Sequence, residues 1–126
     1  MIEDIQLSKN FKLSEFVCKE GKGEVLYDTE MIDKLQALRD CFNVPVQIVS
    51  GYRSPEYNRG VGGSINSQHL LGKAADIAID LDKERVKEKA IELGFKGIGL
   101  YDTFIHLDVR DDPNPRGYSF WDERTQ

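Results

Sequence analysis

Two stretches of the chain repeat apolar residues at intervals of three and four, which is the spacing of an amphipathic helix. The first covers residues 29–42, and Asp28 or Thr29 can cap its start. Its apolar positions are Met31, Ile32, Leu35, Leu38 and Phe42. The second covers residues 82–93, and Gly94 provides a stop signal. The pattern therefore predicts two helices that each bury one face.

Shorter apolar runs predict strands. They cover residues 46–49, 77–79, 97–101 and 104–109. In the last run one face carries Phe104, His106 and Asp108, and the other face is entirely aliphatic. This alternation places a histidine and a carboxylate side by side on the polar face of a strand whose opposite face belongs to the core.

The order of these elements predicts an α+β fold with a small, mainly antiparallel sheet flanked by helices. The chain has no internal repeat and no Pro-, Gly- or Ser-rich linker, so we expect residues 1–126 to form a single domain. Residues 111–126 contain two prolines and four acidic residues and are predicted to lie on the surface. Phe120 and Trp121 can nevertheless fold back onto the body or line a cleft.

Composition narrows the possible partners. The chain has 17 Lys and Arg against 22 Asp and Glu, a formal net charge of −5. Binding to nucleic acid through its phosphates requires a surplus of basic residues, so we expect no nucleic-acid partner. No apolar run approaches the roughly 20 residues of a membrane span, so we expect no insertion into a membrane.

Residues 1–10 lack the apolar core of a signal peptide. We therefore expect a soluble chain made in the cytoplasm, and separately we expect it to be a monomer. The two cysteines, Cys18 and Cys41, form no C-x-x-C pair and stand among apolar neighbours. They are predicted to be buried free thiols.

The candidate chemistry centres on the chain's two histidines, His69 and His106. His69 precedes Asp76 by seven residues, and Gly72 between them permits a tight turn into a strand. Asp76 interrupts an apolar stretch, and a buried carboxylate is costly unless it is paired or binds a metal. Two imidazoles and one carboxylate make a catalytic zinc set, with water as the fourth ligand. The alternatives are hydrogen-bonded structural histidines and a salt-bridged or loop-capping aspartate.

Several blocks of the sequence together resemble the M15 family of zinc peptidases. They are S-G-Y-R-S at 50–54, Asn58, V-G-G at 61–63, S-x-H-x-x-G-x-A-x-D at 67–76, G-x-G-x-Y at 97–101 and F-I-H-L-D at 104–108. This family contains D-Ala-D-Ala carboxypeptidases and phage endolysins and shares its fold with the hedgehog signalling domain. The resemblance covers roughly residues 11–110.

The resemblance implies that Zn²⁺ is bound by His69, Asp76 and His106. It also implies that Arg53 holds a substrate carboxylate or carbonyl, which suits a planar guanidinium. Ser67 is expected to bond the substrate or to orient the loop of His69, and Tyr101 is assigned to substrate binding. The alternative for Arg53 is a structural arginine that pairs with the acidic surface.

The sequence departs from the family at one position. Many members carry an acidic general base three residues before the last histidine ligand, where this chain has Thr103. The nearest carboxylates are those of Asp102 and Asp108. Asp108 lies about 7 Å along the strand from His106 on the same face. We therefore predict that Asp108 is the catalytic base or the partner of His106, with a purely structural role as the alternative.

The resemblance predicts a zinc-dependent enzyme that hydrolyses amide bonds in bacterial peptidoglycan stem peptides, as a carboxypeptidase or an endopeptidase. A lysis enzyme of phage or prophage origin, which reaches the cell wall once the membrane is opened, fits these features. One rival is a non-catalytic zinc module that binds cell-wall peptide or a protein partner. Another is a structural phage component that kept the fold and lost the metal.

Overall fold

A five-stranded β-sheet organises the part of the chain that the computed structural model describes, residues 4–19, 23–111 and 114–125. The strands are β1 (Val46–Ser50), β2 (Ala74–Ile79), β3 (Gly97–Leu100), β4 (Ile105–Asp108) and β5 (Ser119–Asp122). Their order across the sheet is β1-β2-β4-β3-β5, and every pair is antiparallel except β3 and β5. The predicted α+β fold with a mainly antiparallel sheet is confirmed.

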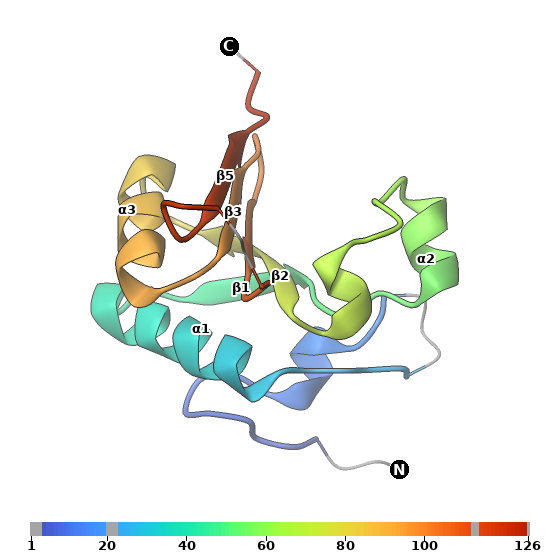
Figure 1. Cartoon of the computed structure of the whole chain (residues 1–126). Coiled ribbons are helices and arrows are strands. Elements are labelled where there is room, and N and C mark those ends of the chain that lie inside the picture. Colours follow the sequence, from blue (N-terminus) through green and yellow to red (C-terminus); the bar gives the residue numbers. More distant parts are fainter. Residues whose placement is uncertain (1–3, 20–22, 112–113, 126) are drawn as a thin grey trace.

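Helices α1 (Thr29–Phe42) and α3 (Lys83–Leu93) lie against one face of this sheet (Figure 1). Both were predicted, and both have the expected ends. The Asp28 side chain accepts a hydrogen bond from the backbone N–H of Met31 at the start of α1. Gly94 ends α3 with a φ of 92°, a left-handed conformation that suits glycine. Between these helices and the sheet lies the hydrophobic core.

Three shorter helical segments complete the fold: the 3₁₀ turns η1 (Leu13–Phe16) and η2 (Gln68–Leu71), and helix α2 (Pro55–Gly60). Helix α2 was not predicted, because six residues are too few to show a helical period. Its start nevertheless has the usual signals: Ser54 caps the helix and Pro55 occupies its first turn. No helix within the described ranges has the length and apolar character that crossing a membrane would need.

The C-terminal segment departs from the prediction. Part of it forms strand β5, which joins the sheet beside β3 instead of lying wholly on the surface. A four-residue strand is hard to recognise alone, and its partner lies about twenty residues earlier in the sequence. As one of the predicted options stated, Phe120 packs against the core and Trp121 lines a cleft.

The prediction of two buried cysteines is half right. Cys18 is buried, whereas Cys41 is exposed. Cys41 lies in α1 but outside the stripe of residues that the helix turns toward the core. Apolar neighbours in the sequence therefore do not suffice to predict that a helical position is buried.

The sheet face opposite α1 and α3 has room for large side chains because β3 carries glycine at two positions. A Cβ atom at Gly97 would overlap the carboxylate of Asp108, and one at Gly99 would overlap the indole of Trp121. This explains the G-x-G spacing of the strand: each glycine makes space for a side chain from a neighbouring strand.

Gly97→Ala is expected to lower the free energy of unfolding by about 1–3 kcal/mol, because the new methyl group overpacks a site with no free volume. Urea unfolding would measure this loss. Gly60→Ala is the matched control, since a Cβ atom there meets nothing within 4 Å. Equal stability of the two variants would show that the space beside Gly97 is not required.

Candidate metal centre

The candidate site occupies the open face of the sheet. Strand register places Asp76 of β2 opposite His106 of β4, His106 opposite Gly99 of β3, and Gly99 opposite Trp121 of β5. These residues form one row across four strands. The hydrogen-bonded sheet therefore fixes two of the three predicted ligands in adjacent positions.

The third ligand, His69, reaches the row from η2. The Ser67 hydroxyl accepts a hydrogen bond from the His69 backbone N–H at 3.2 Å and so starts the 3₁₀ turn. Gly72 then adopts a φ of 70° and lies against the backbone of Leu26, where any side chain would overlap. The chain turns there and enters β2. The spacing between His69 and Asp76 thus corresponds to a tight turn followed by a strand, as predicted.

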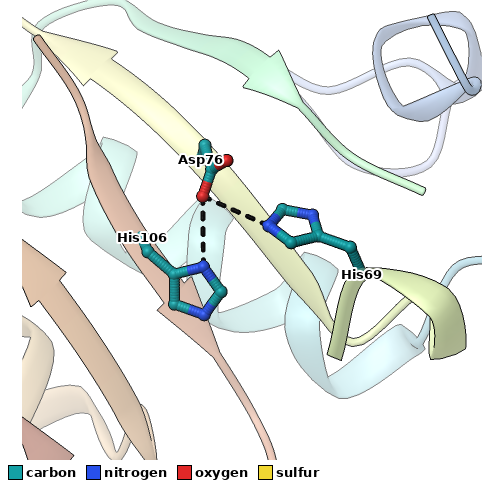
Figure 2. A group of neighbouring side chains, drawn as sticks. All are labelled: His69, Asp76 and His106. Atoms are coloured by element: carbon teal, nitrogen blue, oxygen red, sulfur yellow. Dashed lines mark hydrogen bonds and ion pairs between the residues drawn. The ribbon is translucent and has the colours of Figure 1, made fainter. Parts of the chain in front are cut away.

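The three side chains converge on a single point (Figure 2). The Oδ1 atom of Asp76 lies 3.2 Å from Nε2 of His69 and 3.1 Å from Nδ1 of His106. One ligand atom from each residue lies within 4.8 Å of the other two. All three residues are buried, with exposed fractions of 2%, 4% and 9% for His69, Asp76 and His106.

Each imidazole has one nitrogen that points toward Asp76 and one outer nitrogen that points away from it. The hydrogen-bond partners of the outer nitrogens show which nitrogens are left to bind a metal. His69 Nδ1 lies 2.7 Å from the Gly51 carbonyl oxygen, and His106 Nε2 lies 2.7 Å from Asp108 Oδ2. Both partners accept hydrogen bonds, so each outer nitrogen carries the proton. In a neutral imidazole the inner nitrogen then carries a lone pair. Two lone pairs and a carboxylate oxygen facing one point fit a bound cation, and the nitrogen and oxygen donors suit zinc.

The electrostatics of the centre also favour positive charge. Burial disfavours the charged form of Asp76, but His106 and His69, which donate to it when their inner nitrogens are also protonated, outweigh burial and hold the pKa of Asp76 below its usual range. Burial likewise opposes charge on His106, yet the carboxylates of Asp108 and Asp76 raise its pKa. An ionised carboxylate in a buried place is stabilised by a positive charge beside it, which can be a protonated imidazole or a metal ion.

Arg53 completes the environment of Asp76. Its Nη2 donates to Asp76 Oδ2 at 3.1 Å, while Nε donates to the Ser50 hydroxyl and Nη1 to the Asn58 side-chain carbonyl, both at 3.3 Å. The two oxygens of Asp76 are therefore divided between the histidines and the guanidinium. Arg53 lies within the site and not on an acidic outer surface.

Asp108 lies beneath His106 and is fully buried. Its Oδ2 accepts hydrogen bonds from His106 Nε2 and from Arg110 Nη2, each at 2.7 Å. Burial raises the pKa of Asp108, but the hydrogen bonds from His106 and Arg110 overcome it and lower the pKa to about 2. Asp108 is thus ionised and fixes the orientation of the His106 ring.

The other candidate positions for a base lie elsewhere. Residues 102 and 103 form the turn between β3 and β4, where the backbone N–H of Tyr101 bonds the carbonyl of Phe104. The Asp102 carboxylate accepts hydrogen bonds from the backbone and hydroxyl of Thr125. Thr103 lines a separate hollow, to which Phe104 also contributes.

A cleft of about 630 Å³ opens above the centre. It is lined by the three candidate ligands, by the predicted residues Arg53, Ser67 and Tyr101, and by Trp121 and Glu123. Asp108 is not one of the described residues that line this cleft. Sequence reasoning did not select Glu123, because an acidic residue in an acidic tail gives no signal of its own.

Three candidate ligands at the floor of an open cleft fit a mononuclear metal centre of the catalytic type. The sequence model of the family Peptidase M15 matches residues 9–108, and the chain belongs to this family. This confirms the resemblance seen in the sequence. Arg110, Trp121 and Glu123 lie beyond the matched segment.

Two kinds of relative were found. The chain is 31% identical over 92 residues to the peptidoglycan L,D-endopeptidase MepK of Escherichia coli (strain K12), covering 65% of this chain and 50% of that protein. The same values hold for MepK of Shigella flexneri. The present chain is also 44% identical over 45 residues to the zinc D-Ala-D-Ala carboxypeptidase of Streptomyces albus G, covering 35% of this chain and 18% of that protein. The chain thus spans about half the length of the MepK proteins.

Proposed function

We propose that this chain is a zinc peptidase that hydrolyses an amide bond in the stem peptides of bacterial peptidoglycan. The observation that carries the proposal is the convergence of His69, Asp76 and His106 at the floor of a cleft. The outer nitrogen of each histidine ring is hydrogen-bonded, which leaves the inner nitrogen for a metal. The names of the relatives, a peptidoglycan endopeptidase and a zinc carboxypeptidase, support the substrate class.

The roles of the residues follow from their places in the cleft. Zinc held by the three ligands would supply a Lewis acid for the substrate carbonyl and would make water more acidic. Arg53 lies beside Asp76 and can hold a peptide carboxylate or carbonyl through paired N–H groups. Ser67 also lines the cleft and shapes the turn that carries His69.

For Asp108 we propose the second of the two predicted roles, as the partner that orients His106. A general base must reach the water whose proton it takes, and Asp108 is fully buried with His106 and Arg110 as partners. A carboxylate that bonds the far nitrogen of a metal-binding histidine fixes the ring and makes it a better ligand. The base role stays a prediction, and the variants described in the Discussion separate the two.

Arg53→Lys is expected to lower kcat/KM by about 10- to 100-fold while zinc stays at one per chain, because lysine keeps the charge and loses the paired geometry. Steady-state kinetics and metal analysis would measure both quantities. Arg59→Lys is the matched control, since Arg59 is exposed on α2 and lies outside the cleft. An unchanged kcat/KM in Arg53→Lys would refute the role in substrate binding.

The proposal is tested with synthetic stem tetrapeptides and pentapeptides, separated by chromatography after incubation. We expect hydrolysis by the zinc-loaded protein, loss of hydrolysis after zinc is removed with a chelator, and recovery when zinc is added back. A protein that holds one zinc per chain, binds the peptides and cleaves none would instead be the non-catalytic binding module. The position of Thr103, outside the metal cleft, would then be the feature to examine.

A further inference from the structure

The C-terminal strand brings the chain's single tryptophan, Trp121, to the metal centre. Its indole lies over Gly99, where the missing side chain makes room for it. Gly99 pairs with His106 on its other side, and the centroids of the Trp121 and His106 rings are 5.3 Å apart. The guanidinium of Arg110 lies 5.2 Å from the indole centroid. Trp121 is therefore held in one place next to a metal ligand.

The polar edge of the indole has a specific partner. Trp121 Nε1 donates a hydrogen bond to the hydroxyl oxygen of Tyr101 at 2.8 Å. The Tyr101 ring is fixed as well, since it stacks on Phe104 with a centroid distance of 4.5 Å and an angle of 11°. Two rigid rings thus hold one hydroxyl group at the wall of the cleft that both side chains line.

The direction of this hydrogen bond determines what the hydroxyl can still do. An indole N–H is only a donor, so the Tyr101 oxygen must accept. The hydroxyl proton is then left for another acceptor, and no acceptor for it is found among the residues that the structure describes. Since Tyr101 lines the open cleft, its hydroxyl proton faces the space where an oxygen atom of a bound substrate can replace solvent water as the acceptor.

We propose that Trp121 is a positioning residue, which holds the Tyr101 hydroxyl so that it donates its proton in a hydrogen bond to a substrate oxygen beside the metal centre. This rests on the proposed peptidase function and adds a second recognition group to Arg53. Both Arg53 and Tyr101 line the same cleft, so a peptide there meets a guanidinium and a hydroxyl. Trp121 itself lies beyond the segment that the family model matches.

The test compares Tyr101→Phe, Trp121→Phe and the double variant, using the zinc-loaded protein and a cleaved stem peptide. Tyr101→Phe removes the hydroxyl and keeps the stacked ring, and should lower kcat/KM by about 10- to 100-fold. Trp121→Phe keeps an aromatic ring but removes the N–H together with part of the indole, and should lower kcat/KM by about 3- to 10-fold. The double variant should be no less active than Tyr101→Phe, because Trp121 has no hydroxyl left to orient once Tyr101 is replaced.

Readouts besides activity separate this role from a structural one. Zinc content should stay close to that of the wild type in all variants. The melting temperature should also stay close to it in Tyr101→Phe, whereas Trp121→Phe should lower it slightly because part of the indole packing over Gly99 is lost. Trp121 emission should shift to shorter wavelength in Tyr101→Phe, which loses the acceptor of the indole N–H, and should not shift in the control Tyr27→Phe. Tyr27 is half-exposed and lies outside the cleft.

The outcomes are distinguishable from a failure of the peptidase proposal. An active wild type together with equally active Tyr101→Phe would overturn the inference alone. Losses that multiply in the double variant would also overturn it, because Trp121 and Tyr101 would then act independently. A wild type that neither binds nor cleaves stem peptides would overturn the proposed function and the inference with it.

Discussion

Alanine at any one of His69, Asp76 and His106 is expected to reduce zinc to well below one per chain and to lower peptidase activity by roughly a thousandfold or more. Each change removes one of the three candidate ligands found among the described residues, and a catalytic zinc site has no spare donor. Metal analysis of the purified variants and hydrolysis of a stem peptide would measure the two effects.

The control for Asp76→Ala is Asp80→Ala. Asp80 follows the same strand, is exposed and lies outside the metal cleft, so its loss should leave zinc and activity unchanged. One zinc per chain in all three ligand variants would show that the metal is bound elsewhere. Absence of zinc from the wild type, with no effect of a chelator on stability, would favour a fold that has lost its metal.

Asp108→Ala is expected to have two large effects that would not be expected if Asp108 acted only as a general base. It removes the buried acceptor of the His106 N–H and one partner of the Arg110 guanidinium, which should cost about 3–5 kcal/mol of unfolding free energy. It also frees the His106 ring, which should weaken zinc binding by about 10- to 100-fold. Urea unfolding of the metal-free protein and zinc titration would measure these changes.

If Asp108→Ala does not fold, Asp108→Asn keeps the shape of the side chain and one oxygen that can accept from His106. We expect intermediate stability and zinc affinity in that variant. Unchanged zinc affinity and stability together with a collapse of kcat would instead identify Asp108 as the base and contradict the positioning role.

The sequence contained most of the information for the metal centre because strand alternation is a local property. Residues two apart on a strand share a face, and His106 and Asp108 are indeed 2.7 Å apart at their polar atoms. His69 could be placed beside Asp76 because Gly72 marks the turn that joins them. The resemblance to a known family, and not the spacing alone, then selected His69, Asp76 and His106 together.

What could not be predicted depends on contacts between distant segments. Strand β5 finds its partner β3 through packing of Phe120 on the core and of Trp121 over Gly99. Neither contact leaves a pattern that can be read before the fold is known. The prediction that a single position is buried can fail for the same reason, as it does for Cys41, which is exposed. The single domain, monomeric state, cytoplasmic synthesis and phage-type release expected from the sequence stay predictions.

The most direct test of a metal-dependent wall peptidase is mass spectrometry of purified muropeptides after incubation with the zinc-loaded protein, with His106→Ala in parallel. We predict a loss of mass in the muropeptides with the intact protein only, and the fragment masses would identify the cleaved bond. Unchanged muropeptides, with zinc confirmed at one per chain, would contradict the peptidase function and leave a zinc-containing binding module.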